Sequence, residues 1–198
     1  MQCSRNELTA LLAKAASGTG LPVGVAQDAA RAAVWLEEHG EEGVSSLLAA
    51  LSLEDQHQSA LVRGVAAVDL AIAEPGRSIA VPELDLPILV AGYAGSAAVD
   101  GATVMVTFAA DVSATVGPDR LALTGRVPPR SDVTIEAILP PSVPSLSPPL
   151  TVARPYRGAI DVSDTHWEAA SALAAQTYVP ATEASRLKGA GAGLTDND

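Results

Sequence analysis

The first 74 residues place their apolar positions with the period of a helix. Ser4 and Glu7 have the S-x-x-E spacing of a capping box, in which the serine caps the helix and the glutamate reaches back to it. Apolar residues then recur at helical spacing, at Leu8, Leu11, Leu12 and Ala15. The end of this first helix is predicted where turn-forming residues follow, at Gly18, Gly20 and Pro22.

Three further helices are predicted before residue 75, over residues 25–39, 42–51 and 52–73. The buried face of the first should carry Ala29, Ala32, Ala33 and Leu36. Gly40 suits the position just after its end. Ser52 is the predicted cap of the helix over residues 52–73. Glu54 and Asp55 would lie in its first turn, where the helix dipole favours anions. Pro75-Gly76 should end the helical region.

Residues 77–139 change to short runs rich in Val, Ile, Leu and Thr, separated by Gly, Pro and Asp. Strands are predicted over residues 78–81, 88–91, 102–108, 112–116, 120–124 and 132–138. Residues 103–107 alternate in polarity, as a half-buried strand does. Gly117-Pro118-Asp119 predicts a hairpin. Strands so closely spaced leave no room for crossover helices, so the sheet should be mostly antiparallel.

The last third of the chain begins with a proline-rich stretch. Residues 140–149 hold five prolines in ten positions, which indicates a polyproline-like connector, because proline neither donates to a ladder nor continues a helix. A last helix is predicted over residues 164–176, capped by Ser163 or Thr165, and Pro180 opens a short segment over 182–188. We therefore expect a single α+β domain. Its parts are helical 1–74, β 77–139, Pro-rich 140–150, helical 163–188 and a Gly-rich acidic tail 189–198.

Composition shows what fills the core and which partners the surface repels. Apolar residues make up 48% of the chain and aromatic residues 3%, so Ala, Val, Leu and Ile must fill the core. The net charge is −11, from 23 acidic and 12 basic residues. Such a surface repels phosphate groups, which argues against nucleic acid and anionic membrane as partners. Solubility is a sufficient reason for the charge.

Cysteine content and apolar runs indicate the compartment. Cys3 is the single cysteine, so no intramolecular disulfide can form, and the sequence holds no C-x-x-C or His-rich cluster for zinc. The polar N-terminus is not followed by the apolar core of a signal peptide. No apolar run approaches the ~18–20 residues of a membrane span. We therefore expect a soluble protein of the bacterial cytoplasm, without a metal or other cofactor.

Several segments that could carry chemistry have a simpler structural interpretation. The histidines are interpreted as surface or capping residues, because none pairs with another at helical ligand spacing. They are His39, His57 and His166. Ser96 follows Gly92-Tyr93-Ala94-Gly95, whose glycines do not fit the G-x-S-x-G elbow of serine hydrolases, so this segment predicts a tight turn or bulge. The Gly-Ala run over 189–193 lacks the strand–loop–helix context of a phosphate loop.

Two polar clusters at the ends of the chain are the candidate sites. They are Cys3-Ser4-Arg5-Asn6-Glu7 and Glu183-Ala184-Ser185-Arg186. Each could bind a small polar metabolite through arginine and use glutamate as acid or base, although capping boxes and surface ion pairs have the same composition. The ligand-binding candidates are Arg5, Asn6, Ser185 and Arg186. The catalytic candidates are Glu7, Glu183 and Cys3, the last as a nucleophile if a helix N-terminus lowers its pKa.

The two ends of the chain also carry a family resemblance. At the start of the chain, the segments concerned are residues 3–7, 14–16 and 32–36. At its end they are residues 177–186, the Gly-Ala run and Asp196-Asn197-Asp198. In these segments the sequence resembles an uncharacterised bacterial family of about this length, common in alphaproteobacteria and classed as a domain of unknown function. The resemblance implies length and bacterial origin, and it transfers no catalytic residue. It also weakens the interpretation of residues 189–198 as a merely flexible tail.

Three functions are compatible with these observations. The first is a small-metabolite-binding or accessory protein of bacterial metabolism. The second is an acid–base enzyme whose site forms where the two termini meet, because the termini of small domains are often neighbours. The third is a structural subunit of a larger complex, with an oligomeric or protein partner. The second predicts that the Arg5/Glu7 cluster and residues 183–186 lie close together.

Overall fold

The computed structural model describes residues 1–97, 102–109, 111–138 and 158–177 of the 198-residue chain. Six α-helices lie in these residues: α1 Arg5–Gly18, α2 Val23–Glu38, α3 Gly43–Leu51, α4 Val65–Ala73, α5 Ile88–Ala97 and α6 Asp164–Ala175. The strands in the same part of the chain are β1 Gln2–Cys3, β2 Ser78–Asp85, β3 Thr103–Ala109, β4 Val112–Gly117, β5 Arg120–Thr124, β6 Arg130–Ile138 and β7 Ile160–Asp161. The predicted α+β class with a C-terminal helix is confirmed.

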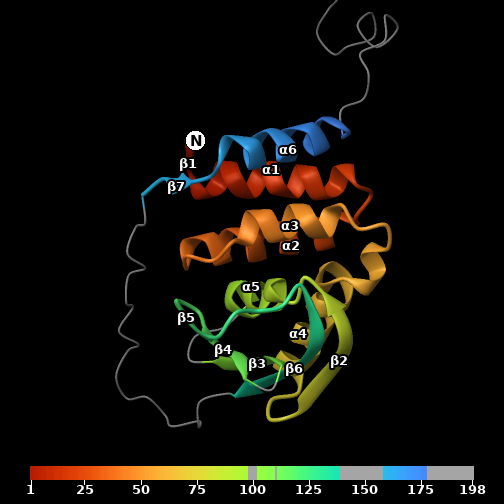
Figure 1. The fold of residues 1–198 in the computed structure, drawn as a ribbon, viewed down its shortest axis with the longest axis vertical. Coiled ribbons are helices and arrows are strands. Elements are labelled where there is room, and N and C mark those ends of the chain that lie inside the picture. Colours follow the sequence, from red (N-terminus) through yellow and green to blue (C-terminus); the bar gives the residue numbers. More distant parts are fainter. Residues whose placement is uncertain (98–101, 110, 139–157, 178–198) are drawn as a thin grey trace, which may run out of the picture.

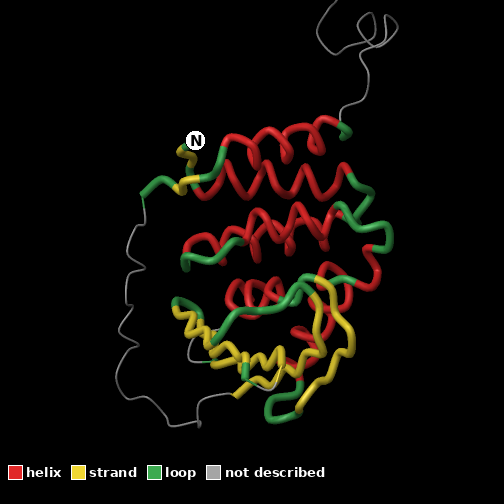
Figure 2. The backbone as a smooth tube through the Cα atoms, viewed as in Figure 1, coloured by secondary structure: helices red, strands yellow, loops and turns green. Residues whose placement is uncertain are grey.

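The helices form layers on one side of a twisted sheet (Figure 1). α6 and α1 pack together as the outermost layer, and α2 and α3 form the next. α5 lies between α2 and the sheet, while α4 contacts β2 and β6. Figure 2 shows the same separation, with the strands at the end of the molecule farthest from α6. One continuous set of buried residues runs from α1 to the sheet, so the helical and β parts share a core.

The sheet has five strands in the order β2-β6-β3-β4-β5, and every neighbouring pair is antiparallel. The predicted hairpin is present: Gly117 pairs with Arg120, and Pro118-Asp119 forms the two-residue loop. Along β3 the side chains alternate as predicted, with Val104 and Val106 buried and Met105 exposed. A separate antiparallel pair, β1 and β7, joins the N-terminus to residues 160–161.

The prediction of a strand over residues 88–91 is wrong, because these residues begin helix α5. α5 is buried over Leu89–Gly95, on almost every side. A helix buried all round has no polar face, so its sequence shows no 3.6-residue period and a short apolar run reads as a strand. For the same reason the predicted turn or bulge at residues 92–95 is wrong, since Gly92 and Gly95 lie inside the helix.

The prediction of one helix over residues 52–73, capped by Ser52, is also wrong. Ser52 ends α3, and α4 begins only at Val65. Between them lie a 3₁₀ turn, Gln56–Gln58, and a π-helical turn, Ala60–Gly64. The Asp55 carboxylate accepts a hydrogen bond from the His57 amide, and the Ser59 hydroxyl accepts one from the Leu61 amide. These side chains bond to the nearby backbone in place of a continuous helix, which is why the helix is interrupted.

The other predicted helix ends are confirmed. Ser4 and Glu7 form the capping box: the Glu7 amide donates to Ser4 Oγ at 3.2 Å, and the Ser4 amide donates to Glu7 Oε2 at 3.0 Å. Gly40 has φ +82°, the left-handed conformation of a residue that ends a helix. Ser163, the first of the two proposed caps, accepts the His166 amide at the start of α6.

Glycines allow the helix layers to approach one another closely. A Cβ added at Gly92 would lie 2.5 Å from the Ala32 carbonyl oxygen, and a Cβ at Gly95 would overlap the Trp35 ring. α5 therefore lies against α2 nearly backbone to backbone. No helix in the described part of the chain has the length and apolar content needed to cross a membrane.

Candidate functional site

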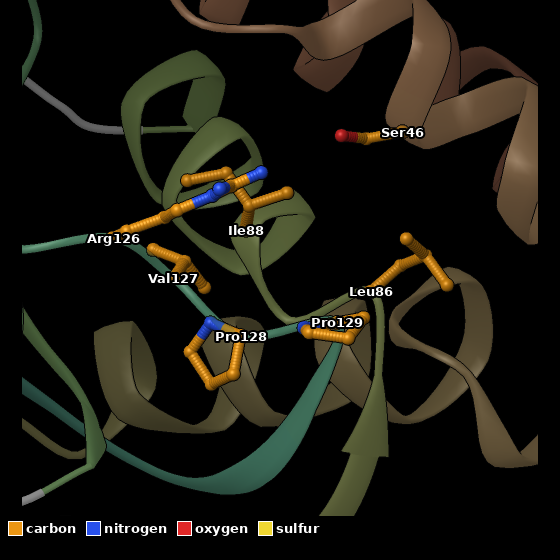
Figure 3. Close-up of a pocket in the computed structure, with 7 residues that line it drawn as sticks. All are labelled: Ser46, Leu86, Ile88, Arg126, Val127, Pro128 and Pro129. Carbon is orange, nitrogen blue, oxygen red and sulfur yellow. The ribbon is translucent and has the colours of Figure 1, made fainter.

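A hollow of about 470 Å³ lies where α3, the β2–α5 connection and the β5–β6 connection meet (Figure 3). It is lined by Ser46, Leu86, Ile88, Arg126, Val127, Pro128 and Pro129. The lining thus combines one hydroxyl and one guanidinium with five apolar side chains. Its volume lies in the range of small-molecule sites, roughly 300–1,000 Å³, and like them it combines apolar side chains with a few polar groups, while one side is open to solvent.

The β5–β6 connection supplies four of the lining residues, and its sequence fixes its shape. Gly125 has φ +76°, a conformation that glycine adopts without steric cost, and it turns the chain directly after β5. Pro128 and Pro129 then restrict the backbone φ angle before β6 begins at Arg130. A turn followed by two prolines holds Arg126 and Val127 at the edge of the hollow.

Two non-glycine residues near the end of β2 have a left-handed backbone: Glu83, within the irregular part of the strand, with φ +47°, and Leu86, in the β2–α5 connection, with φ +52°. Such conformations cost about 1–3 kcal/mol each and persist only where contacts hold them. The Glu83 amide donates to Asp132 Oδ1 at 2.8 Å, and the Leu86 amide donates to the Pro129 carbonyl at 2.8 Å. Arg130 forms an ion pair with Glu83 at 3.3 Å. The Leu86–Pro129 bond joins two walls of the hollow.

Arg126 differs from most of the described cations because it has no hydrogen-bond or ion-pair partner in the described residues. Arg5, Arg31, Arg77 and Arg130 form ion pairs with Glu38, Asp28, Glu74 and Glu83. Arg63 donates to Gln58 Oε1 and to the Pro82 carbonyl. Arg126 is exposed, and Figure 3 shows its side chain extending across Ile88 with the guanidinium on the side of the hollow where Ser46 lies.

Ser46 lies in the first turn of α3 and is half-buried. Its hydroxyl makes no hydrogen bond within the described residues, whereas the hydroxyl of its neighbour Ser45 donates to the Glu42 carbonyl. Figure 3 shows the Ser46 oxygen pointing toward the hollow. Ser46 and Arg126 are thus two polar groups at the same hollow whose side chains make no polar contact within the described ranges.

Cys3, the candidate nucleophile, belongs to the core. Its side chain is 4% exposed, and Sγ donates a weak hydrogen bond to the Ile160 carbonyl at 3.6 Å. Burial raises the pKa of the Cys3 thiol, and the charge of Glu7 raises it further. The helix N-terminus does not produce the lowered pKa that a nucleophilic thiolate needs.

Two of the other N-terminal candidates, Arg5 and Glu7, make contacts that hold α1 in place. Arg5 forms an ion pair with Glu38 of α2 at 3.4 Å. Hydrogen bonds from the Ser4 amide and then the Ser4 hydroxyl lower the pKa of Glu7, as expected for the carboxylate of a capping box. Asn6 is exposed in the first turn of α1.

The C-terminal candidates Glu183, Ser185 and Arg186 lie outside the described residues, as do the Pro-rich connector and the Gly-rich tail. Whether residues 183–186 meet the Arg5/Glu7 cluster therefore stays a prediction. The structure does place the N-terminus beside the start of α6. The Met1 amino group donates to the Val162 carbonyl at 2.7 Å and pairs with Asp164 at 3.1 Å.

The histidines lie apart from the hollow. His39 stacks on Trp35 with ring centroids 3.8 Å apart, and its Nδ1 lies 2.7 Å from the Trp35 carbonyl oxygen. His57 and His166 occupy capped first turns. Ser96 Oγ donates to the Tyr93 carbonyl within α5. Within the described ranges, no three His, Cys, Asp or Glu side chains gather closely enough to hold a metal ion.

Sequence reasoning missed every residue of the hollow. Residues 46, 86–88 and 126–129 are far apart in the chain, and nothing in their spacing predicts that they meet. One local signal was present: Gly125-Arg126-Val127-Pro128-Pro129 places a charged residue in a rigid connection between two strands. That segment could have been identified as a fixed loop, and loops held by a rigid scaffold often carry binding residues.

Comparison with known proteins gives a family match for the N-terminal region. Residues 3–73 match a family described as "Protein of unknown function (DUF3726)". The match covers about a third of the chain and confirms the predicted resemblance to a domain of unknown function over that part. It includes Ser46 but none of the other residues of the hollow. No curated protein and no solved structure is significantly similar to the chain.

Proposed function

We propose that the protein binds a small metabolite, and that the hollow between α3, α5 and the β5–β6 connection is its binding site. The observation that carries this proposal is that Arg126 and Ser46, two polar groups without a side-chain partner among the described residues, share one hollow with five apolar side chains. Polar groups that no protein contact uses are available to fix the orientation of a ligand, and apolar walls supply contact area.

The rigidity of the walls supports the same proposal. Leu86 and Glu83 keep a left-handed backbone that neighbouring hydrogen bonds hold in place. Strained residues of this kind concentrate at binding and active sites. Walls that are already fixed also lose less conformational entropy when a ligand binds. The hollow is therefore suited to a ligand without needing a large rearrangement.

A binding role fits the lining better than acid–base catalysis does. The seven lining side chains include no carboxylate, imidazole or thiol. The enzyme hypothesis relied instead on the termini, where Arg5 pairs with Glu38, Glu7 is part of the capping box and Cys3 is buried. The proposal includes action in the bacterial cytoplasm. The lone, buried Cys3, which has no second cysteine to pair with, is compatible with that location.

The test is a thermal-shift screen of the full chain against a metabolite library, because a ligand that binds the folded state raises the melting temperature. Ser46→Leu should fill the hollow and remove the shift. Ala49→Leu adds the same side chain at an exposed position of the same helix and should keep it. Circular dichroism of each variant without ligand confirms that both are folded. The proposal fails if no metabolite shifts the wild type, or if Ser46→Leu retains the full shift.

A further inference from the structure

Resting on the proposed function, a chemical class of ligand follows from the charges and shape of the hollow. We propose that it takes a short aliphatic carboxylate, whose carboxylate group binds the Arg126 guanidinium and whose hydrocarbon part covers the apolar wall. Three features of the described residues support this class: a cation without a partner among them, the orientation of helix α5, and the five apolar side chains.

The first feature is the charge balance. The chain has 23 acidic and 12 basic residues, so carboxylates are abundant on its surface, and most described arginines have found one. Arg126 pairs with no carboxylate of the described residues, and none of the lining residues is acidic. Charges on the rest of the surface are screened over a distance of about 8 Å at physiological salt. A ligand in the hollow therefore meets a local positive charge on a protein that is acidic as a whole.

The geometry of arginine favours a carboxylate over a simple point charge. The guanidinium is planar, always charged, and donates two parallel hydrogen bonds to the two oxygens of a carboxylate. The Ser46 hydroxyl, which also lacks a partner in the described residues, offers a third donor from across the hollow (Figure 3).

The second feature is helix orientation. Ile88 is the first residue of α5, and Ser46 lies in the first turn of α3, so both helices present their N-terminal turns to the hollow. The N-terminus of a helix carries a partial positive charge from the aligned peptide dipoles, which stabilises an anion nearby. The N-terminal turn of α3 already holds the Glu37 carboxylate, which accepts the Val44 amide at 2.8 Å. The N-terminal turn of α5 therefore adds to the positive potential that Arg126 creates, and this potential disfavours binding of an amine.

The third feature is the apolar wall, which should favour a carboxylate with a hydrocarbon chain over inorganic phosphate. Its members are Leu86, Ile88, Val127, Pro128 and Pro129. Inorganic phosphate would leave these side chains uncovered, whereas an aliphatic chain removes them from water. Each buried methylene improves affinity roughly fourfold, so affinity should rise with chain length until the hollow is filled.

The experiment is isothermal titration calorimetry of the full chain with butanoate, hexanoate and octanoate, and with hexanamide, hexylamine and inorganic phosphate as probes of other chemistry. We expect affinity to increase from butanoate to hexanoate, and hexanamide, hexylamine and phosphate to bind at least tenfold more weakly than hexanoate. Arg126→Gln should weaken hexanoate at least tenfold. Arg120→Gln is the matched control, because Arg120 is exposed, lies outside the hollow and also has no partner in the described residues. It should change hexanoate affinity less than twofold.

The outcomes separate this inference from the proposed function. The inference of a carboxylate ligand is wrong if hexanamide or hexylamine binds as tightly as hexanoate. It is also wrong if Arg126→Gln leaves the affinity for hexanoate unchanged. Tight binding of phosphate alone also overturns it. If the library yields ligands that Ser46→Leu abolishes but none is a carboxylate, the ligand class is wrong and the proposed function stands. If neither the library nor the carboxylates bind, both are wrong.

Discussion

The two ends of helix α5 have opposite packing. Toward α2, Gly92 and Gly95 bring the helix so close that a single added methyl group would meet the Ala32 carbonyl or the Trp35 ring. At its start, where Ile88 and the preceding Leu86 face α3 and the β5–β6 connection, the structure leaves a hollow of about 470 Å³. One ten-residue helix thus takes part in both a very close and a notably open contact of the described structure.

The hollow therefore does not reflect a general inability of this sequence to fill space. Protein interiors are normally packed as densely as organic crystals, and the α2–α5 contact meets that standard by using glycine where a side chain would not fit. Leaving half-buried apolar side chains beside an unfilled space forgoes burial that would stabilise the fold. This contrast agrees with a role for the hollow other than stability.

The largest expected effect comes from adding one methyl group to the closed contact. Gly95→Ala places a Cβ on the Trp35 ring in a fully buried region, so the ring or the helix must shift. Overpacking of this kind should lower the free energy of unfolding by about 3 kcal/mol. Urea denaturation followed by tryptophan fluorescence measures the loss.

Gly24→Ala is the matched control for this change. Gly24 lies in the first turn of α2, and an added Cβ there meets nothing within 4 Å. The same substitution should therefore stabilise the protein, by about 0.5–1 kcal/mol, because alanine loses less backbone entropy on folding. If Gly95→Ala were as well tolerated as Gly24→Ala, the description of a closed α2–α5 contact would be wrong.

A smaller effect is expected at the outer layer of the helix stack, where α1 relies on its cap. Ser4→Ala removes the hydroxyl that accepts the Glu7 amide, and should lower the free energy of unfolding by about 1 kcal/mol. Ser4→Asp retains an accepting oxygen and should recover most of the loss. Denaturant titration of the three proteins gives the values. An unchanged stability in Ser4→Ala would show that packing alone holds the start of α1.

A still smaller effect is expected from filling the hollow. Ser46→Leu adds a larger side chain than Gly95→Ala does, yet it enters open space and replaces serine with a better helix former. The free energy of unfolding should rise by about 0.5 kcal/mol or stay unchanged. Thermal and urea unfolding measure it without ligand. A loss of more than about 1 kcal/mol would mean that the hollow is already occupied by the protein's own atoms.

The smallest effect concerns pH at the junction of α2 and α3. The pKa of Glu37 is raised, mainly because the carboxyl group is buried, and the negative charge of Glu42 adds to the effect. Hydrogen bonds from the Val44 and Gly43 amides, the first at 2.8 Å to Oε1, and the charge of His166 oppose the rise without cancelling it. A raised folded-state pKa means that the stabilising contribution is complete below the unfolded pKa and is lost as pH rises through the folded pKa. The stability of Glu37→Gln relative to wild type should therefore increase from pH 4 to pH 7.

Glu7→Gln provides a comparison of opposite sign. The Ser4 hydrogen bonds lower the pKa of Glu7, so its contribution is present above the unfolded pKa and is lost as pH falls through the folded pKa. Relative to wild type, Glu7→Gln should therefore lose stability from pH 3 to pH 5. Unfolding curves measured from pH 3 to pH 7 check both variants. Two parallel pH profiles would contradict the assigned environments.

The parts of the fold that could be predicted are those whose signals are local. The capping box at Ser4 and Glu7 depends on atoms three residues apart, and the hairpin at Pro118-Asp119 depends on its own turn residues. The alternation of polar and apolar residues along β3 could be predicted from the sequence, because one face of the strand is buried and the other faces solvent. The interruption between α3 and α4 was missed, because it depends on which backbone groups Asp55 and Ser59 contact.

The candidate site was much less predictable than the fold. The polar cluster at residues 3–7 has the composition of a binding site, but most of its side chains have structural roles. Ser4 and Glu7 form the cap of α1, Arg5 forms an ion pair with α2, and Cys3 is buried. Arg126 looks ordinary in the sequence. Its interest arises from a missing partner and from neighbours contributed by α3 and α5, neither of which a single stretch of sequence contains.

Most helix ends, most of the described strands, the antiparallel hairpin and the acidic composition followed from the sequence alone, because they depend on residues a few positions apart or on residue counts. Only the tertiary structure decided that residues 88–97 form a helix, since burial on almost every side removes the period that would identify it. The tertiary structure alone also brought Ser46, Ile88 and Arg126 together at one hollow. Packing acts between segments far apart in the chain, and so do the contacts that a binding site needs.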